Sequence, residues 1–188
     1  MSGHSQFSLL TQRRFLPYFV VQALGAFNDN VYRQAIIGLL GAMVLAGSIS
    51  PDARALYTQL APAIFIVPYF LFSATAGQVA ERMEKQKLVT TAMEIAIMSL
   101  AAVGFLLQNM PLLLLALFCT GLQSTLFGPV KYSILPSVLA PEELTGGNGL
   151  VEMGTSISIL LGMIFGGSIF LLAGTAGPYV AAVSIILL

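Results

Sequence analysis

The sequence predicts an all-α membrane protein, and two observations lead to this fold class. Hydrophobic residues make up 57% of the 188-residue chain and charged residues only 9%. Its mean hydropathy is +0.89. A soluble domain carries about 25% charged residues, so this chain could not cover its surface in water. The apolar residues also gather in runs close to the roughly 20 residues that a helix needs to cross a bilayer.

Five such runs and part of a sixth follow one another along the chain. The polar tail 1–14 is expected in the cytoplasm and lacks the apolar core of a signal peptide. The last run is 11 residues long and would reach only about 16 Å, so we expect the sixth span to be incomplete. The expected spans are about 15–46, 56–79, 88–107, 112–129, 148–172 and 178–188.

The first span contains a charged pair, Asp29 and Arg33, in the middle of an apolar run. The four-residue spacing brings both side chains onto one helix face. One uncompensated charge at mid-bilayer costs at least about 2.5–3.5 kcal/mol, so an ionisable residue there indicates a functional site. The alternative is a structural ion pair that holds two helices together. Tyr18, Gln22 and Gly25 continue the same polar stripe.

The later spans have their own features. Pro62 and Pro68 lie in the second span, where a membrane bundle tolerates the kink they cause. Glu94 is an acidic residue within the apolar third span, and we expect it to have a structural role. Small residues recur every four positions in the fifth span, and this stripe predicts close helix packing: Gly154, Ser158, Gly162 and Gly166.

The basic residues predict the orientation, because cytoplasmic loops carry the excess of Lys and Arg. A cytoplasmic N-terminus leaves only Arg54 on the outer side. The cytoplasmic side or its edge then holds Arg13, Arg14, Arg82, Lys85, Lys87 and Lys131.

Composition also excludes several classes of protein. Net charge is zero with no basic cluster, which argues against nucleic acid as a partner. The single cysteine, Cys119, cannot form an internal disulfide, and the single histidine, His4, cannot build a histidine-based metal site or triad. We expect no cofactor and no metal. Neither a Gly-x-Ser-x-Gly elbow nor a His-x4-Asp motif is present, so the chain offers no enzymatic site of these types.

The loop between the second and third spans resembles the glycine–acid–arginine loop of the major facilitator superfamily. It contains Gly77, Glu81, Arg82 and Lys85. The resemblance implies a loop that locks the cytoplasmic helix ends in one state of a transport cycle. Glu81 replaces the usual aspartate, and Glu84 stands where a second glycine is common. A solvated charged loop is the alternative.

Three further segments are similar to the bacterial lysophospholipid transporters of that superfamily: GAFNDN at 25–30, GPVKYSIL at 128–135 and GNGLVE at 147–152. The resemblance implies a six-helix half-bundle of two inverted three-helix repeats, with the first and fourth helices lining a central cavity. It implies transport of lysophospholipid, chiefly lysophosphatidylethanolamine, to the inner leaflet of the bacterial inner membrane for re-acylation. The opening RRFLP with GAFNDN looks most like the version fused to an acyltransferase and acyl–acyl-carrier-protein synthetase.

The family's substrate-binding residues match Asp29, Asn30, Lys131, Tyr132 and Glu152, and Arg33 joins them by its spacing alone. A carboxylate suits the lipid's ammonium and a lysine suits its phosphate, which makes Asp29 the ammonium candidate and Lys131 the phosphate candidate. Lys131 could instead extend along apolar surface to the cytoplasmic edge. The expected partners are the lysolipid, the bilayer and the missing C-terminal half of the transporter.

Two alternatives stay open beside lysophospholipid transport. The chain could transport another small amphipathic solute, or it could be the membrane part of a fused phospholipid acyltransferase. A non-catalytic membrane subunit is disfavoured by the charged residues within the spans.

Overall fold

The computed structural model describes residues 6–81 and 86–187, and within these it leaves out the side chains of residues 75, 77–81, 86–89, 127 and 129–133. The described residues form helices and contain no strand, so the all-α prediction is confirmed. The long helices are α1 (Leu16–Leu45), α2 (Pro51–Glu81), α3 (Gln86–Leu106), α4 (Met110–Ser133), α6 (Leu144–Ala173) and α7 (Gly177–Leu187). Shorter elements are η1 (Gln6–Thr11), α5 (Leu135–Val138), η2 (Pro141–Glu143) and η3 (Gly174–Ala176).

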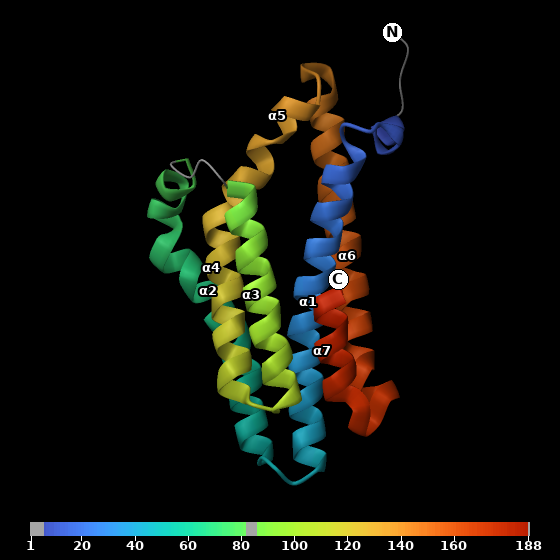
Figure 1. Cartoon of the computed structure of the whole chain (residues 1–188). Coiled ribbons are helices and arrows are strands. Elements are labelled where there is room, and N and C mark those ends of the chain that lie inside the picture. Colours follow the sequence, from blue (N-terminus) through green and yellow to red (C-terminus); the bar gives the residue numbers. More distant parts are fainter. Residues whose placement is uncertain (1–5, 82–85, 188) are drawn as a thin grey trace.

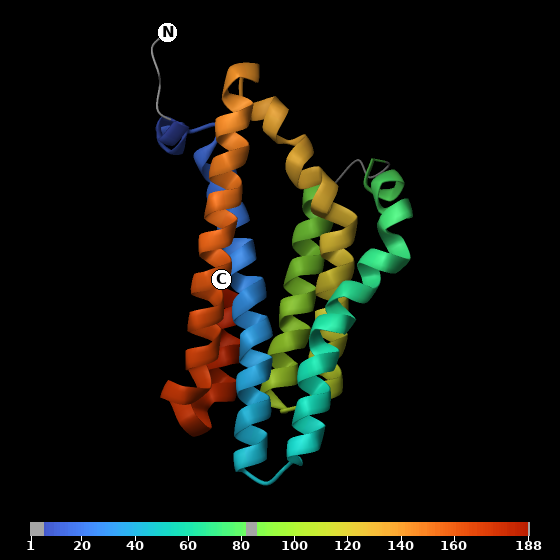
Figure 2. The same cartoon turned by 180° about the vertical axis from the view of Figure 1, so that it is seen from behind.

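The long helices run side by side in two groups. One group contains α2, α3 and α4, and the other contains α1, α6 and α7 (Figure 1). The main contacts join α1 to α6, α2 to α4, and α3 to both α4 and α7. At one end of the bundle, α5 links α4 to α6, and the N-terminal η1 lies at the same end (Figures 1 and 2).

Turn chemistry explains where several helices begin and end. Gly47 follows α1 with a φ of 70°, and its N–H donates to the Val44 carbonyl. This glycine-ended arrangement satisfies helix carbonyls that would otherwise lack donors. The Ser50 hydroxyl accepts from Ala53 N–H to begin α2, and the Asn109 side chain accepts from Leu112 N–H to begin α4.

The expected small-residue stripe packs α6 against α1. Gly154, Gly162 and Gly166 are buried, and a β-carbon on Gly162 would lie 2.5 Å from the Phe27 carbonyl oxygen of α1. This prediction is confirmed: the absence of side chains brings the two backbones together at Gly162 and Gly166, and Gly154 makes room for the Phe19 ring. Two aromatic rings, Phe27 and Phe165, contact each other beside this seam.

A similar close approach joins α2 to α4. A β-carbon on Gly121 would overlap the backbone carbonyl oxygen of Phe65. Pro62 and Pro68 lie inside α2, and toward its C-terminal end this helix bends away from α4 (Figure 2). A proline removes one backbone hydrogen bond and clashes with the preceding turn, which accounts for a bend in this helix.

The core lies in the half of the bundle away from α5. Buried Tyr32 of α1 donates its hydroxyl hydrogen to the Leu113 carbonyl of α4, and its ring meets Phe105 of α3 edge to face. A second, smaller apolar cluster lies near the N-terminus and joins η1 and the start of α1 to α5 and α6. Its buried members are Leu9, Phe15, Leu135, Leu139, Leu150 and Val151.

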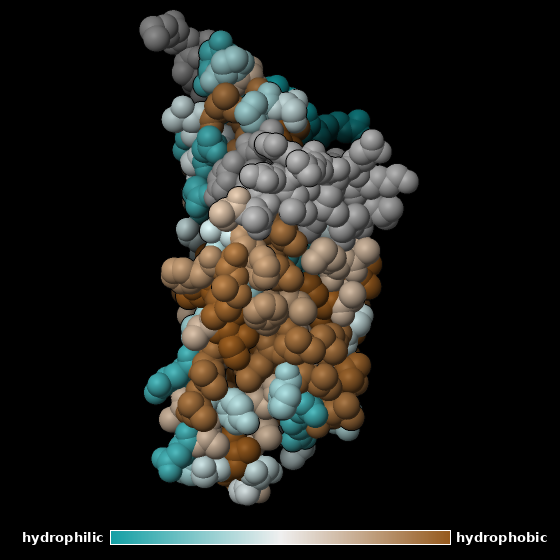
Figure 3. All heavy atoms as spheres, turned by 90° about the vertical axis from the view of Figure 1, so that its left-hand side faces the viewer, coloured by the Kyte–Doolittle hydropathy of each residue, from teal (hydrophilic) through white to brown (hydrophobic). Residues whose placement is uncertain are grey.

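The outer surface is apolar in the middle of the molecule. Figure 3 shows hydrophobic atoms across the centre of the face on the α2 side, with hydrophilic atoms toward both ends of the molecule. Exposed apolar side chains of α2 include Ile66, Val67, Phe70 and Leu71. By length and hydropathy, two described stretches could cross a membrane, Pro51–Ala74 and Pro141–Leu187, and Thr90–Leu106 and Met110–Leu126 are shorter apolar segments.

Candidate functional site

The candidate site is a group of polar side chains that four helices bring together within the bundle. Asp29 and Arg33 come from α1, Glu94 from α3, and Tyr69 and Ser124 from α2 and α4. Asp29 and Arg33 are half-buried. The charge of Asp29 interacts with those of Glu94 and Arg33, so the site holds two acids and one base within electrostatic reach of one another.

Arg33 lies against an aromatic ring and forms no ion pair with Asp29. Its guanidinium carbon is 4.4 Å from the centroid of the Phe65 ring of α2. The ion pair recorded among the described residues joins other side chains, so the expected direct Asp29–Arg33 bridge is not found. The shared helix face puts Arg33 within reach of Asp29, but the quadrupole of the Phe65 ring attracts the guanidinium across to α2.

Glu94 has a partner that its position in the sequence does not reveal. The buried Gln123 side chain of α4 donates one N–H to Glu94 Oε2 and is 3.4 Å from the Thr90 carbonyl oxygen. This contact links α3 to α4 and agrees with the structural role expected for Glu94. A charge-assisted hydrogen bond of this kind fixes the orientation of the carboxylate.

Tyr69 lines the α2 side of the site. Its ring centroid is 5.9 Å from that of Phe65, one turn earlier on the same helix. Its hydroxyl lies near Ser124 of α4, and the charges of Asp29 and Arg33 both act on it. Sequence reasoning missed Phe65, Tyr69 and Ser124. The available signal was the aromatic pair at four-residue spacing on one face of α2.

Asn30 lies on a different face of α1 from this group. Its buried side chain donates to the Ala26 carbonyl of its own helix at 2.8 Å, and its β-carbon lies against Gly162 of α6. A role for Asn30 in substrate binding stays a prediction, because its contacts are with the α1–α6 seam.

Glu152 is exposed on α6 and lies at another depth along the bundle. Gly154 packs against Phe19, whereas Gly162 packs against Phe27 and Asn30, next to Asp29. At 1.5 Å per residue, the ten residues from Glu152 to Gly162 separate Glu152 from the level of Asp29 by about 15 Å. The structure therefore does not bring Glu152 beside Asp29.

The other predicted residues lie where side chains or whole residues are not described. Lys131 and Tyr132 fall within α4, and Gly77 and Glu81 fall within α2, but their side chains lie outside the described residues. Arg82 and Lys85 of the conformational loop lie outside them altogether. Their assigned roles stay predictions.

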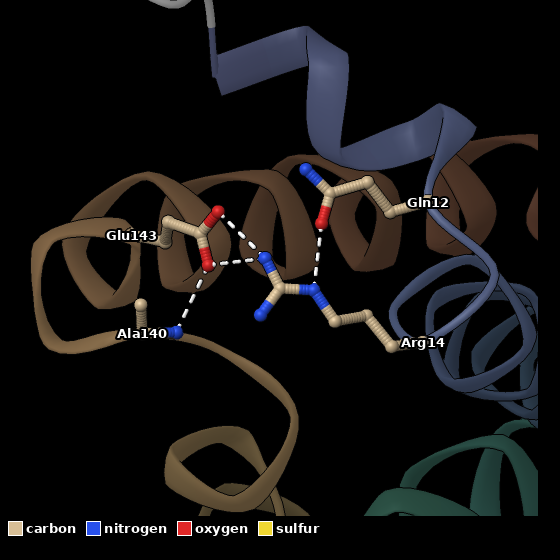
Figure 4. Close-up of polar contacts among 4 residues, drawn as sticks. All are labelled: Gln12, Arg14, Ala140 and Glu143. Atoms are coloured by element: carbon tan, nitrogen blue, oxygen red, sulfur yellow. Dashed lines mark hydrogen bonds and ion pairs between the residues drawn. The ribbon is translucent and has the colours of Figure 1, made fainter.

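An ion pair at the α5 end of the bundle was also missed (Figure 4). Arg14 Nη2 lies 2.7 Å from both carboxylate oxygens of Glu143, and Arg14 Nε donates to Gln12. Glu143 also accepts from the Ala140 backbone N–H at 2.9 Å. This backbone bond and the Arg14 guanidinium hold the pKa of Glu143 below its usual range. The two residues are 129 positions apart, so no spacing rule could pair them.

Comparison with known proteins gives a consistent family. Residues 15–188 match the Major Facilitator Superfamily. The chain is 30% identical over 166 residues to the lysophospholipid transporter LplT of Enterobacter sp. (strain 638), covering 88% of this chain and 38% of that protein. It is 30% identical over 148 residues to that of Escherichia coli (strain SE11), covering 79% and 34% of the two chains. It is 31% identical over 152 residues to the lysophospholipid transporter LplT of Salmonella newport (strain SL254), covering 81% of this chain and 35% of that protein.

The chain thus spans little more than a third of the length of these relatives. No solved structure matches it. The family match covers every long helix described above. It agrees with the apolar composition and with the charged side chains that Asp29, Arg33 and Glu94 place within the bundle. This chain is a membrane protein that belongs to the Major Facilitator Superfamily.

Proposed function

We propose that this chain forms part of a transporter that moves lysophospholipid, chiefly lysophosphatidylethanolamine, across the bacterial inner membrane to the cytoplasmic leaflet for re-acylation. The proposal is supported by the similarity to proteins named as lysophospholipid transporters. The structural observation that carries it is the presence of opposite charges at one depth between otherwise apolar helices. Asp29 suits the ammonium of a zwitterionic headgroup, and a basic residue suits its phosphate.

We further propose that the chain is an N-terminal half of two inverted three-helix repeats. In this arrangement α1, α2 and α3 correspond to α4, α6 and α7. The contact pattern supports the correspondence, because exchanging the repeats turns the α1–α6 pair into the α2–α4 pair and leaves α3–α7 unchanged. Inverted repeats place substrate sites near the middle of the bilayer, where they meet. The other half of the transporter would complete the cavity lined by α1 and α4.

We propose a cytoplasmic N-terminus and several membrane crossings, from the distribution of basic residues. The loop with Gly77, Glu81, Arg82 and Lys85 would lock the cytoplasmic helix ends in one state of the cycle. Lys131 and Tyr132 are in the last turn of α4, next to α5, and Glu152 is in the first third of α6, so these positions are nearer to α5 than Asp29 is. They would contact the headgroup nearer the cytoplasm, whereas Asp29 would bind its ammonium at greater depth. An acyltransferase and acyl-carrier-protein synthetase, fused or associated, would consume the product.

Uptake of radiolabelled lysophosphatidylethanolamine tests the proposal. We expect inverted membrane vesicles that contain the full-length protein to differ from vesicles without it in lysolipid movement between leaflets. Lysolipid movement equal to that of empty vesicles would contradict the proposal. If the protein moved other amphipathic solutes, and lysolipid neither moved nor competed with them, the protein would be a transporter of another solute. Acyl transfer without lysolipid movement would favour a membrane part of an acyltransferase.

A further inference from the structure

The environment of Arg33 sets it apart from the other basic residues that the structure describes. Arg13, Arg14 and Arg54 are exposed, whereas Arg33 lies within the bundle and is half-buried. Its Nε atom is fully buried and has no hydrogen-bond partner among the described residues. A buried donor without an acceptor is costly, and each such group in a native structure calls for an explanation.

The Phe65 ring holds the guanidinium without using its hydrogen-bonding capacity. The guanidinium carbon lies 4.4 Å from the ring centroid, and this cation–π contact requires no hydrogen bond from the guanidinium. The N–H donors of the guanidinium keep the fork geometry that matches phosphate oxygens. Phe65 is itself fixed in place, because the α2 backbone at this residue packs directly on Gly121 of α4.

The neighbouring acids do not use these donors. Asp29 lies within electrostatic reach of Arg33 but forms no ion pair with it in the described part of the chain. Glu94 is hydrogen-bonded by Gln123 of α4. Tyr69, one turn from Phe65 on α2, and Ser124 of α4 carry hydroxyls, which are further donors of the kind that bind phosphate.

We propose that Arg33, positioned by the Phe65 ring, binds the phosphodiester of the lysolipid headgroup when the ammonium is at Asp29. This inference rests on the proposed function and adds a subsite to it. Lys131 is eighteen residues beyond Leu113, whose carbonyl accepts from Tyr32 of α1, so its backbone lies about 27 Å along α4 from that contact. Arg33, by contrast, is one turn from Asp29 on the same helix. A headgroup at Asp29 therefore has Arg33 as its nearer cation, and Lys131 serves a position closer to the cytoplasm.

Binding of three lipids to the purified full-length protein tests this assignment. The probes are lysophosphatidylethanolamine, lysophosphatidylglycerol, which has the phosphate and no amine, and monoacylglycerol, which has neither. We expect Arg33→Gln to weaken binding of both phospholipids by about ten- to a hundredfold, the worth of a lost charge-assisted bond. Monoacylglycerol binding should stay unchanged. Arg33→Lys should retain part of the affinity, because it keeps the charge but loses the fork.

A matched control and a second variant separate binding from folding. Arg54→Gln removes an exposed arginine on α2 and should leave all three affinities unchanged. Phe65→Leu keeps an apolar side chain and should weaken the two phospholipids less than Arg33→Gln does. If Arg33→Gln does not fold, Arg33→Lys and Phe65→Leu carry the test.

The outcomes distinguish this inference from the proposed function. Phospholipid affinities unchanged in the Arg33 variants would overturn the inference alone. An equal loss for monoacylglycerol would overturn it too, because that lipid has no phosphate. Wild-type protein that binds neither phospholipid would overturn the proposed function and the inference together.

Discussion

Gly166 of α6 lies so close to Val31 of α1 that a β-carbon at position 166 would overlap the Val31 carbonyl oxygen. The two helices therefore contact each other through their backbones. Asp29 lies two residues before Val31 on the same helix. The position of the acid in the site thus depends on how closely α6 supports α1.

Gly166→Ala should lower the free energy of unfolding by about 1–3 kcal/mol, because the added methyl group forces two packed backbones apart. Thermal unfolding of the purified protein in detergent measures the change. The matched control is Gly167→Ala, where nothing lies within 4 Å of the added β-carbon. This neighbour should be neutral or stabilising, since alanine is the better helix former. Equal effects of the two substitutions would contradict the packing argument.

The Arg14–Glu143 pair should make the stability of the α5 end depend on acid pH. Because the folded state lowers the pKa of Glu143, the carboxylate stabilises the fold above its usual pKa of about 4.3. That contribution is lost as pH falls through the lower folded-state value. Hydrogen exchange of the Ala140 amide, which donates to Glu143, should accelerate relative to the rest of the chain over this range.

Glu143→Gln should remove this acid-dependent step and expose the Ala140 amide at neutral pH as well. The matched control is Glu142→Gln, which changes an exposed neighbour and should leave the pH profile as it is. A step that persists in Glu143→Gln would assign the acid sensitivity to another group.

The proposed orientation predicts which loops an impermeant thiol reagent can reach. In a Cys119→Ala background, a cysteine at Asp52 should react from outside intact cells, and a cysteine at Glu84 should react only after the membrane is opened. The reverse labelling pattern would show that the N-terminus faces outward.

Asp29→Asn should abolish or strongly reduce lysophosphatidylethanolamine transport while membrane insertion stays intact. The amide keeps the size and hydrogen bonding of the side chain but removes the charge that complements the ammonium. Lysolipids without an amine should be less sensitive to the change. Transport assays in vesicles that contain equal amounts of wild-type and variant protein make the comparison.

The double exchange Asp29→Arg with Arg33→Asp provides the counter-test. If the two residues served only as a structural pair, the exchange would restore transport. If Asp29 binds the headgroup, the exchange should fail, because the new arginine no longer lies on Phe65 and the acid has moved one turn. Normal transport by Asp29→Asn would rule out both roles.

The sequence alone was sufficient for features that depend on one helix at a time. Apolar runs of bilayer length predict helices, because backbone groups in lipid must be hydrogen-bonded within the segment. Small residues at four-residue spacing, Gly154, Ser158, Gly162 and Gly166, predict a flat helix face, and the glycines of this face are where α1 packs. The same reasoning identified Asp29 and Arg33 as neighbours on one side of α1.

Contacts between helices were decided only by the tertiary structure. Arg33 could have paired with Asp29 by spacing, but the close packing of Gly121 on α2 brings the Phe65 ring beneath the guanidinium. Likewise, Gln123 reaches Glu94 only because α3 and α4 lie side by side. Helical periodicity specifies which side chains share a face of one helix, whereas the helix that meets this face is chosen by the packing of all of them together.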